Sequence, residues 1–382
     1  MNERDARVEG RGDAGVEGRG DAGVDRGGVD RGGVEAGAAT APGHWVADEL
    51  GCDESYGAWL AELDGDGAPA DETLLPAPDD AAALLRRLGC PESAVTATVT
   101  TLPDASSDPA RWWLLERCRA RLVRDLGDPG ASRGLWPQLP PRLGAAGGAF
   151  YLHLFLATMP ATLRYHEDRD VPEDVSWATL ADLGRHVALY GATHGATGVD
   201  EPWWMTLHLR GILYEIGRLQ YSVFRLGEGP EHPKPWYDDS DAALLGPGFR
   251  AGDETLGIHI PAGGPLTPDA CAASYRRARH VIDASFPVPG RRVATCSTWL
   301  LDDQLDEYLP PESNILAFRR SFQLVPGWVE GDRNVMTFVF RTHDTPLDKL
   351  PRDTRMQRAV VSHLSGGRHF HWRTGWLDLP RA

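Results

Sequence analysis

The stretch Leu256-Gly-Ile-His-Ile-Pro-Ala-Gly-Gly-Pro-Leu-Thr-Pro-Asp269 decides the fold of the C-terminal half of the chain. Its first five residues form a short apolar run that predicts a strand at 256–260. Thr267 at an N-cap position, Pro268 at the first helical position and Asp269 in the first turn predict a helix start. Apolar residues recur every three or four positions as far as Ile282, so one face of this helix is buried. The stretch therefore predicts a strand, a glycine loop and a capped helix in direct succession.

The segments on either side of this stretch predict further strands and helices after residue 200. A helix is expected from Asp200 through Ile216, because bulky apolar residues recur there at helical spacing. Strands are expected at 219–224, 293–301, 322–329 and 334–341, and helices at 313–322 and 353–364. This mixture predicts an α/β (α+β) fold, with a mixed-sheet domain at residues 200–382. The position of the first strand of the sheet stays open.

Residues 44–199 have the pattern of a mainly helical N-terminal domain. Helices are expected at 79–88, 108–126, 149–166 and 176–190, with Asp108 and Ser176 as N-caps and Gly89 just beyond a C-terminus. Bulky residues such as Trp204 are interpreted as core positions rather than ligand contacts. We expect the helical domain to form a substrate-side lid on the sheet domain rather than an independent domain.

Residues 1–43 are a low-complexity segment rich in glycine and in charges of both signs. Such a composition buries too little apolar surface to offset the entropy of ordering. We predict a disordered tail whose deletion leaves the melting temperature within a degree or two. The two Arg-Gly-Asp triplets are interpreted as products of a repeat rather than as adhesion motifs.

The net charge of −16 and the absence of a basic stripe argue against a nucleic-acid partner. The five cysteines form no CxxC pair, and no apolar signal region precedes residue 44. The apolar run 149–159 is too short to cross a bilayer. We therefore expect a cytoplasmic protein that does not enter the membrane. The predominance of arginine over lysine, together with much Ala, Gly and Pro, indicates a bacterial source.

Four segments together carry a resemblance to a known family. They are Arg210-Gly-Ile-Leu-Tyr-Glu-Ile-Gly-Arg-Leu-Gln-Tyr221, Ile258-His-Ile-Pro-Ala-Gly-Gly-Pro-Leu266, Cys296-Ser-Thr-Trp-Leu-Leu301 and Ser313-Asn-Ile315. They resemble an actinobacterial family of acyltransferase proteins, in which an N-acyltransferase N-terminal helical domain precedes a GNAT-like C-terminal domain. The resemblance covers residues 75–380. It implies transfer of an acyl group from an acyl-CoA to a small-molecule amine that the sequence does not identify.

The resemblance also implies where acyl-CoA binds. In GNAT folds, free backbone groups of a splayed strand pair with the pantetheine amides, and the pyrophosphate lies on the N-terminus of the next helix. Here this implies a cofactor site at Ile258, Ile260, Ala262, Gly263, Gly264, Leu266, Thr267 and Asn314. No metal is implied. The glycines allow the backbone to approach a phosphate closely.

Two features depart from the usual GNAT pattern. The glycine loop has no basic residue at its lead position, and Ser321 occupies the position of the usual general-acid tyrosine. These departures leave open a second class of function, a catalytically silent GNAT-like module that binds a small ligand or a protein partner. A third class, a metal-dependent hydrolase that uses His369 and His371, lacks a recognisable third ligand. We interpret those two histidines as part of a surface strand.

Two residues are the candidates for chemistry. His259, on the strand before the glycine loop, has a side chain that titrates near neutral pH and so suits a general base for the attacking amine. Cys296 is a candidate for protonating the leaving thiolate or for carrying the acyl group. A satisfied strand histidine and a buried core cysteine are the structural alternatives for these two residues.

Overall fold

The computed structural model describes residues 43–66, 74–131, 134–226, 239–245, 249–286, 292–342 and 344–380. Residues Ala41–Ala382 form one unit of the chain. The tail expected at residues 1–43 lies outside the described residues except for Gly43, which begins the first helix.

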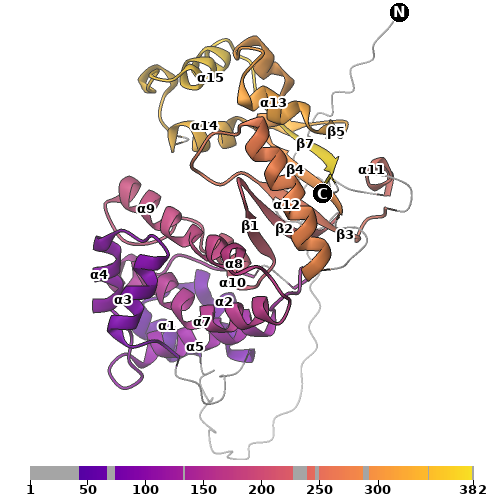
Figure 1. Cartoon of the computed structure of the whole chain (residues 1–382). Helices are drawn as coiled ribbons and strands as arrows, with labels where there is room; N and C mark the ends of the chain where they lie inside the picture. Colours follow the sequence, from indigo (N-terminus) through magenta and orange to yellow (C-terminus); the bar gives the residue numbers. More distant parts are fainter. Residues whose placement is uncertain are drawn as a thin grey trace, which may run out of the picture. The chain divides into compact units, whose positions relative to one another are not determined.

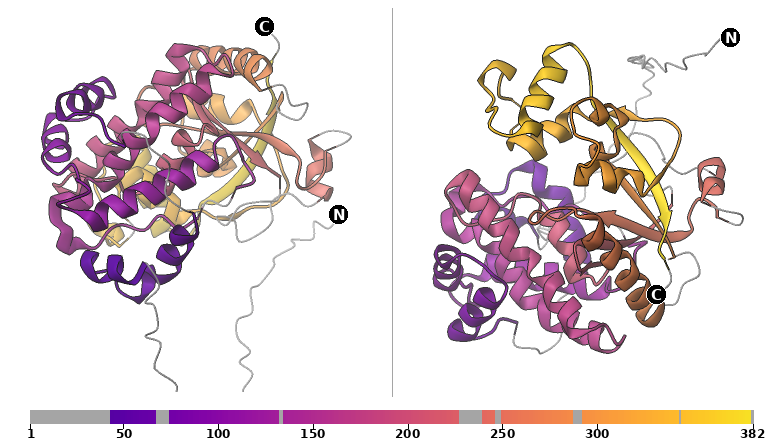
Figure 2. Two further views of the ribbon diagram at one scale, coloured as in Figure 1. Left: turned by 90° about the horizontal axis from the view of Figure 1, so that it is seen from below. Right: turned by 45° about the horizontal axis from the view of Figure 1, so that its top comes forward.

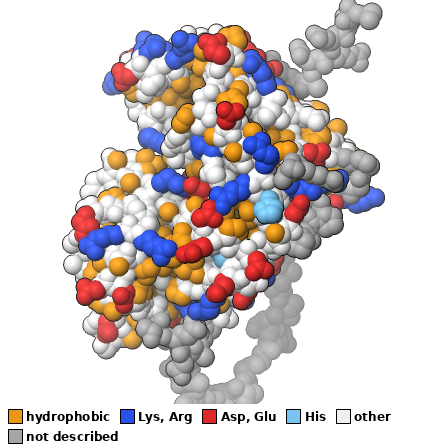
Figure 3. Space-filling view, viewed as in Figure 1, with side chains coloured by type: hydrophobic (Ala, Val, Ile, Leu, Met, Phe, Trp, Pro, Cys, Tyr) orange, Lys and Arg blue, Asp and Glu red, His pale blue; other side chains and the backbone are white. Residues whose placement is uncertain are grey.

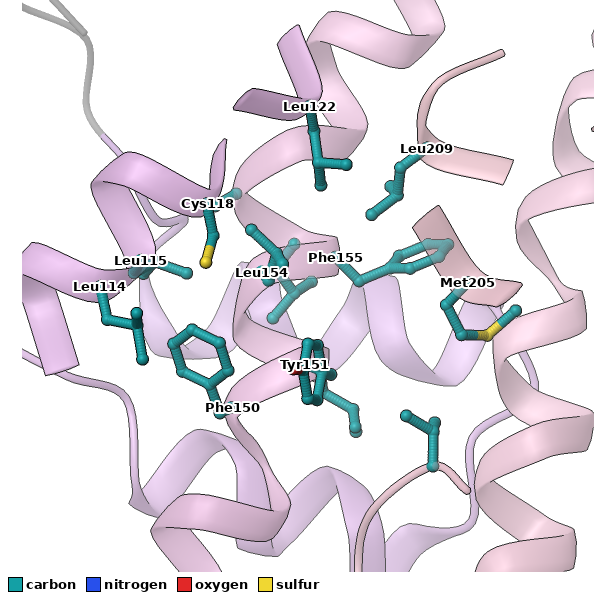
Figure 4. Close-up of a cluster of buried hydrophobic side chains, with 14 of the residues drawn as sticks. Leu114, Leu115, Cys118, Leu122, Phe150, Tyr151, Leu154, Phe155, Met205 and Leu209 are labelled. Carbon is teal, nitrogen blue, oxygen red and sulfur yellow. The ribbon is translucent and has the colours of Figure 1, made fainter. Parts of the chain in front are cut away.

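The helices of the N-terminal part, which we call the helical half, surround one apolar core (Figure 1). They are α1 (Gly43–Leu50), α2 (Gly57–Gly65), α3 (Pro78–Arg87), α4 (Glu92–Thr100), α5 (Pro109–Arg124), α6 (Gly144–Gly148), α7 (Phe150–Glu167), α8 (Glu173–Leu180), α9 (Asp182–His194) and α10 (Pro202–Leu209), with 3-10 turns at Glu54–Tyr56 and Pro141–Leu143. Side chains of α5, α7 and α10 interdigitate in the core (Figure 4). The expected cap of α5 is confirmed, since the Asp108 side chain accepts a hydrogen bond from the Arg111 N–H. Ser176 is not a cap: it lies inside α8, and its hydroxyl contacts Nδ1 of His166.

The most apolar stretch of the sequence lies in helix α7. The helical run Pro141–Glu167, which contains the apolar run 149–159, is long and apolar enough to cross a membrane by length and composition alone. However, 67% of its most apolar window is buried inside the fold. The stretch is apolar on all sides because α7 is the central helix of the helical half.

The C-terminal part, which we call the sheet half, contains a seven-stranded sheet. Its strands are β1 (Leu213–Ile216), β2 (Leu219–Arg225), β3 (Glu254–His259), β4 (Val293–Thr298), β5 (Gln323–Leu324), β6 (Val329–Glu330) and β7 (His371–Asp378). The order across the sheet is β1-β2-β3-β4-β7-β5, with β6 also paired to β7, and β3 with β4 is the parallel pair. Helix α12 (Pro268–Ser285) lies across one face of the sheet (Figures 1 and 2). The remaining elements are α11 (Asp239–Leu244), α13 (Asn314–Arg320), α14 (Asp332–Phe340), α15 (Arg355–Ser365) and 3-10 turns at Trp299–Leu301, Asp303–Glu307 and Leu347–Lys349.

The sheet corrects the expected secondary structure at four places. The helix expected through Ile216 ends at Leu209, and the missing first strand, β1, follows Gly211, whose φ of 62° ends the helix. The strand expected at 334–341 is helix α14. The strand expected at 322–329 consists of two short strands separated by Pro326 and Gly327, the latter at φ 91°. The strand that begins at His371 is not at the surface edge, because β7 pairs with β4 on one side and β5 on the other.

Candidate functional site

Strands β3 and β4 diverge after two residue pairs. The parallel ladder joins Leu256 to Ala294 and Gly257 to Thr295, and no later residues of the two strands are paired. Beyond that point β3 continues to pair with β2 as far as His259, while β4 continues to pair with β7 as far as Thr298. The two strands therefore open like a wedge, and the main-chain groups on the inner edges of the wedge lack sheet partners among the described residues.

A cavity of about 540 Å³ fills this wedge. Its walls come from both halves of the protein: α9 and the start of α10 on one side, and β3, the glycine loop, the end of β4 and α14 on the other. In the view of Figure 3 the surface is hollowed between α9 and α14, and the cavity wall carries both basic and acidic side chains. The size suits a small organic ligand rather than a single ion.

His259 is the histidine of β3 that lines this cavity. Its Nε2 lies 2.7 Å from the Ser222 hydroxyl, and its ring meets that of Trp204 edge-on at a centroid distance of 4.8 Å. Gly257 makes room for this pair, since a Cβ there would lie 2.8 Å from the Ser222 Oγ and 3.2 Å from the imidazole. The orientation of the imidazole is therefore fixed by its neighbours on β2 and α10.

The glycine loop of residues 261–265 forms the end wall of the cavity. Gly263 and Gly264 have φ values of 103° and 58°, which favour glycine. Thr267 caps α12 as expected, accepting a hydrogen bond from the Ala270 N–H at 3.3 Å. The positive φ values turn successive peptide groups in the loop, as in backbone sites that bind anions.

The residues predicted to bind the cofactor divide into two groups. Ile258, Ile260, Ala262, Gly263 and Gly264 line the cavity. Leu266 is packed in the core of the sheet half, Thr267 caps α12, and Asn314 begins α13, so none of these three is part of the cavity wall.

Comparison with known proteins identifies the family. The sequence matches the N-acyltransferase N-terminal domain over residues 79–211 and the GNAT-like C-terminal domain over residues 213–377. It is 42% identical to an acyltransferase solved in complex with CoA and 10C-teicoplanin, with a TM-score of 0.79. The same identity and a TM-score of 0.78 relate it to an acyltransferase in complex with decanoyl-CoA and teicoplanin. Each alignment covers 88% of this chain and 99% of the other. The chain belongs to this acyltransferase family. No curated protein matches it.

Cys296 lies at the wall of the acyltransferase cavity but is 2% exposed and packs in the core of the sheet half. Burial raises the pKa of its thiol to about 12. A thiol with that pKa is a poor proton donor and has very little thiolate at neutral pH. The geometry therefore favours the structural alternative for Cys296.

Asp182, at the start of α9, is a buried carboxylate at the cavity floor that the sequence did not single out. It accepts hydrogen bonds from Nε2 of His208 and Nε2 of Gln220, both at 2.9 Å, and it pairs with Arg185. Burial alone would raise the pKa of Asp182, but hydrogen bonds from His186 and His208 outweigh that effect and hold it well below its usual range. The carboxylate therefore stays ionised and joins the helical half to the sheet.

The sequence patterns did not predict several other residues of the cavity wall. Trp204, interpreted as a core position, packs against the core of the helical half and also contacts His259 in the cavity. Asn334, Phe338 and Arg341 line the cavity from one face of α14, the element that was expected to be a strand. Their spacing of four and three residues is the helical signal that could have found them.

A tyrosine from another element lies beside Ser321, the residue at the position of the usual general-acid tyrosine. The hydroxyl of Tyr275, on α12, lies 3.4 Å from the Ser321 Oγ. Tyr275 is buried outside the cavity wall, and burial raises the pKa of its phenol. It therefore supports the packing of α12 against α13 rather than proton transfer in the cavity.

The C-terminal histidines lie in two clusters with carboxylates, Asp302–Asp303–His371 and Glu330–Asp332–His369. The Asp302 carboxylate already accepts hydrogen bonds from the main-chain N–H of Gln304 and of His371. Asp332 likewise accepts from Phe370 N–H and lies 2.6 Å from Nδ1 of His369. These contacts connect β7 and the residues just before it to neighbouring segments, so both clusters have a structural role.

Proposed function

We propose that the protein is an acyl-CoA-dependent N-acyltransferase that acylates an amine on an amphipathic small molecule. The single observation that carries this proposal is the open wedge between β3 and β4, which ends at the glycine loop and the N-terminus of α12. In such a wedge the pantetheine amides pair with free strand groups, and the phosphates lie near the helix N-terminus. Family membership and the relatives in complex with acyl-CoA support the same cosubstrate.

The proposed reaction needs few protein groups. The amine nitrogen attacks the thioester carbonyl, the C–N bond forms, the C–S bond breaks, and the sulfur leaves as the thiolate of CoA, which takes up a proton. The imidazole of His259 accepts the proton that the amine loses, directly or through a bound water. Its contacts with Ser222 and Trp204 support this role because they hold the ring in the cavity before substrate binds.

The acceptor side of the cavity supports the proposed substrate class. Trp203 and Trp204 of α10 and Phe338 of α14 offer apolar surface, and Phe338 is 54% exposed. Arg341 adds a cation at the end of α14. Such a mixed wall suits an amphipathic molecule, and two relatives were solved with teicoplanin or a derivative of it. We therefore propose glycopeptide-like amines as the first acceptors to try.

The test is turnover of octanoyl-CoA and decanoyl-CoA with a panel of amines that includes teicoplanin-type glycopeptides. Free thiol release and the mass of the product are measured together. We expect acyl transfer, and we expect His259→Asn to lower kcat by about 10² or more while acyl-CoA still raises the melting temperature. Binding of acyl-CoA without turnover of any amine would favour the silent binding module. No binding and no turnover would refute the proposal.

A further inference from the structure

Arg218 lies in the tight turn between β1 and β2, far in sequence from the glycine loop that it contacts. Gly217 precedes it with a φ of 73° and turns the chain, so the Arg218 side chain extends under the loop. Its Nε donates to the carbonyl of Pro265 at 3.2 Å, Nη1 to that of Pro261 at 3.2 Å, and Nη2 to that of Gly264 at 2.9 Å. One guanidinium therefore holds three carbonyls of a five-residue loop.

The amide groups of the same loop are left without partners. Among the described residues, no hydrogen bond is made by the main-chain N–H groups of Ala262, Gly263, Gly264 or Leu266. In a trans peptide the N–H points opposite to the carbonyl that precedes it. The carbonyls of Pro261 and Pro265 point toward Arg218, so the N–H groups of Ala262 and Leu266 point away from it. The loop thus has its acceptors on one side and free donors on the other, which is the arrangement of a backbone anion site.

The charge of Arg218 is only partly balanced, by the nearby carboxylate of Glu215. Within the described part of the chain it forms no ion pair, whereas Arg185, the neighbouring cavity arginine, is paired with both Asp182 and Glu215. Two of its five N–H donors are not used in the three loop contacts. Arg218 lines the cavity together with the loop. The loop itself contains no basic residue, and its two prolines remove two possible donors.

We propose that Arg218 is the positioning residue for the diphosphate of the acyl donor: it turns the loop carbonyls away so that the loop amides face the phosphates, and it supplies the positive charge that the loop lacks. This inference rests on the proposed function. A guanidinium suits the role because its planar fork can hold several carbonyls at once and stays charged. A lysine has one ammonium group and cannot span the same three oxygens.

The test compares two acyl donors, octanoyl-CoA and octanoyl-pantetheine, which carries the same thioester but no phosphate. For Arg218→Gln we expect KM for octanoyl-CoA to rise at least 10-fold with kcat within about 3-fold, and KM for octanoyl-pantetheine to stay unchanged. Arg218→Lys should fall between Arg218→Gln and the unaltered protein. Arg276→Gln, on the exposed side of α12, removes the same charge without contacting the loop and should change neither KM.

The outcomes separate the two proposals. If Arg218→Gln or Arg218→Lys leaves KM for octanoyl-CoA unchanged, or raises KM for both donors equally, Arg218 does not act on the diphosphate and the inference is overturned. If Arg218→Gln does not fold, Arg218→Lys decides the matter in the same assay. If the unaltered protein neither binds nor uses octanoyl-CoA, the proposed function itself is wrong.

Discussion

Two buried histidines of the helical half are held neutral by their surroundings. His153 is fully buried, and its Nε2–H donates to the carbonyl of Thr98 at 2.9 Å. His166 is 1% exposed and contacts the Ser176 hydroxyl. Burial lowers the pKa of each imidazole to about 4. Each side chain therefore packs as a neutral core residue near pH 7.

These histidines should make the protein sensitive to mild acid. Between a pKa of about 6.5 in the unfolded chain and about 4 in the folded chain, the unfolded state binds more protons. The free energy of unfolding therefore falls as the pH is lowered through this window. At pH 5 the loss is about 2 kcal/mol for each histidine, from ~1.4 kcal/mol per pH unit. Urea unfolding at pH 7 and pH 5 measures this difference.

A variant isolates the contribution of one histidine. In His153→Gln the loss between pH 7 and pH 5 should be smaller by about 2 kcal/mol, even if the variant is less stable at both pH values. The control His280→Gln, at an exposed position on α12, should keep the full loss. An unchanged pH dependence in His153→Gln would show that the imidazole is not kept neutral by the fold.

At the scale of elements, the sequence predicted those whose ends carry local signals. Helices α5 and α12 begin at the caps Asp108 and Thr267 that the sequence predicted, and each cap hydrogen bond is present. The sequence did not predict strand β1, because both of its faces are buried and its apolar residues therefore do not alternate with polar ones. The sequence did not predict helix α14, because the valine and phenylalanine residues of this segment favour strands. Its buried residues, Val335, Met336 and Val339, nevertheless follow a helical spacing.

The C-terminal end of α14 carries backbone strain at the cavity. Arg341 has a φ of 59° and Asp170 a φ of 55°, and they are the two residues other than glycine with positive φ in the described chain. A left-handed residue that is not glycine costs on the order of 1 kcal/mol. Strain at a residue that lines a cavity is consistent with a functional constraint on its side chain.

Replacing each strained residue with glycine tests that interpretation. We expect both Arg341→Gly and Asp170→Gly to raise the free energy of unfolding by up to about 1 kcal/mol, the strain that is relieved, and so to raise the melting temperature slightly. Only Arg341→Gly should raise KM for the acceptor, since Arg341 lines the cavity and Asp170 does not. Thermal melts and steady-state kinetics measure the two effects. If the two variants have the same KM for the acceptor, the strained conformation of Arg341 serves packing and not acceptor binding.

At the scale of the whole molecule, the candidate site is built from segments that the sequence does not place together. The sequence predicted the strand, loop and helix of residues 256–269, because these are contiguous. It could not predict that Arg218 supports the loop, that Trp204 flanks His259, or that α14 closes the cavity, because each contact joins residues more than 40 positions apart. Such contacts depend on the tertiary fold rather than on local pattern.

The two halves also share buried groups. Val171 and Val175 of the helical half belong to the same apolar cluster as the sheet residues Tyr214 and Tyr221. Leu207 of α10 and Leu213 of β1 share a second buried cluster. The Asp182 carboxylate joins α9 to Gln220 of β2 in a buried position. The interface between the halves is therefore made of buried apolar and polar groups.

We accordingly expect that residues 200–382 expressed alone do not fold. This fragment would expose the apolar surface that Val175 covers and would leave Gln220 and His208 without their carboxylate partner, at about 1–3 kcal/mol for each unpaired buried group. Residues 41–382 should melt cooperatively, with native near-UV circular dichroism. In that longer chain Asp182→Asn should lower the stability without abolishing the fold, because the apolar contacts remain. A soluble 200–382 fragment that melts cooperatively would show instead that the sheet half is an independent domain and that the shared core adds little to its stability.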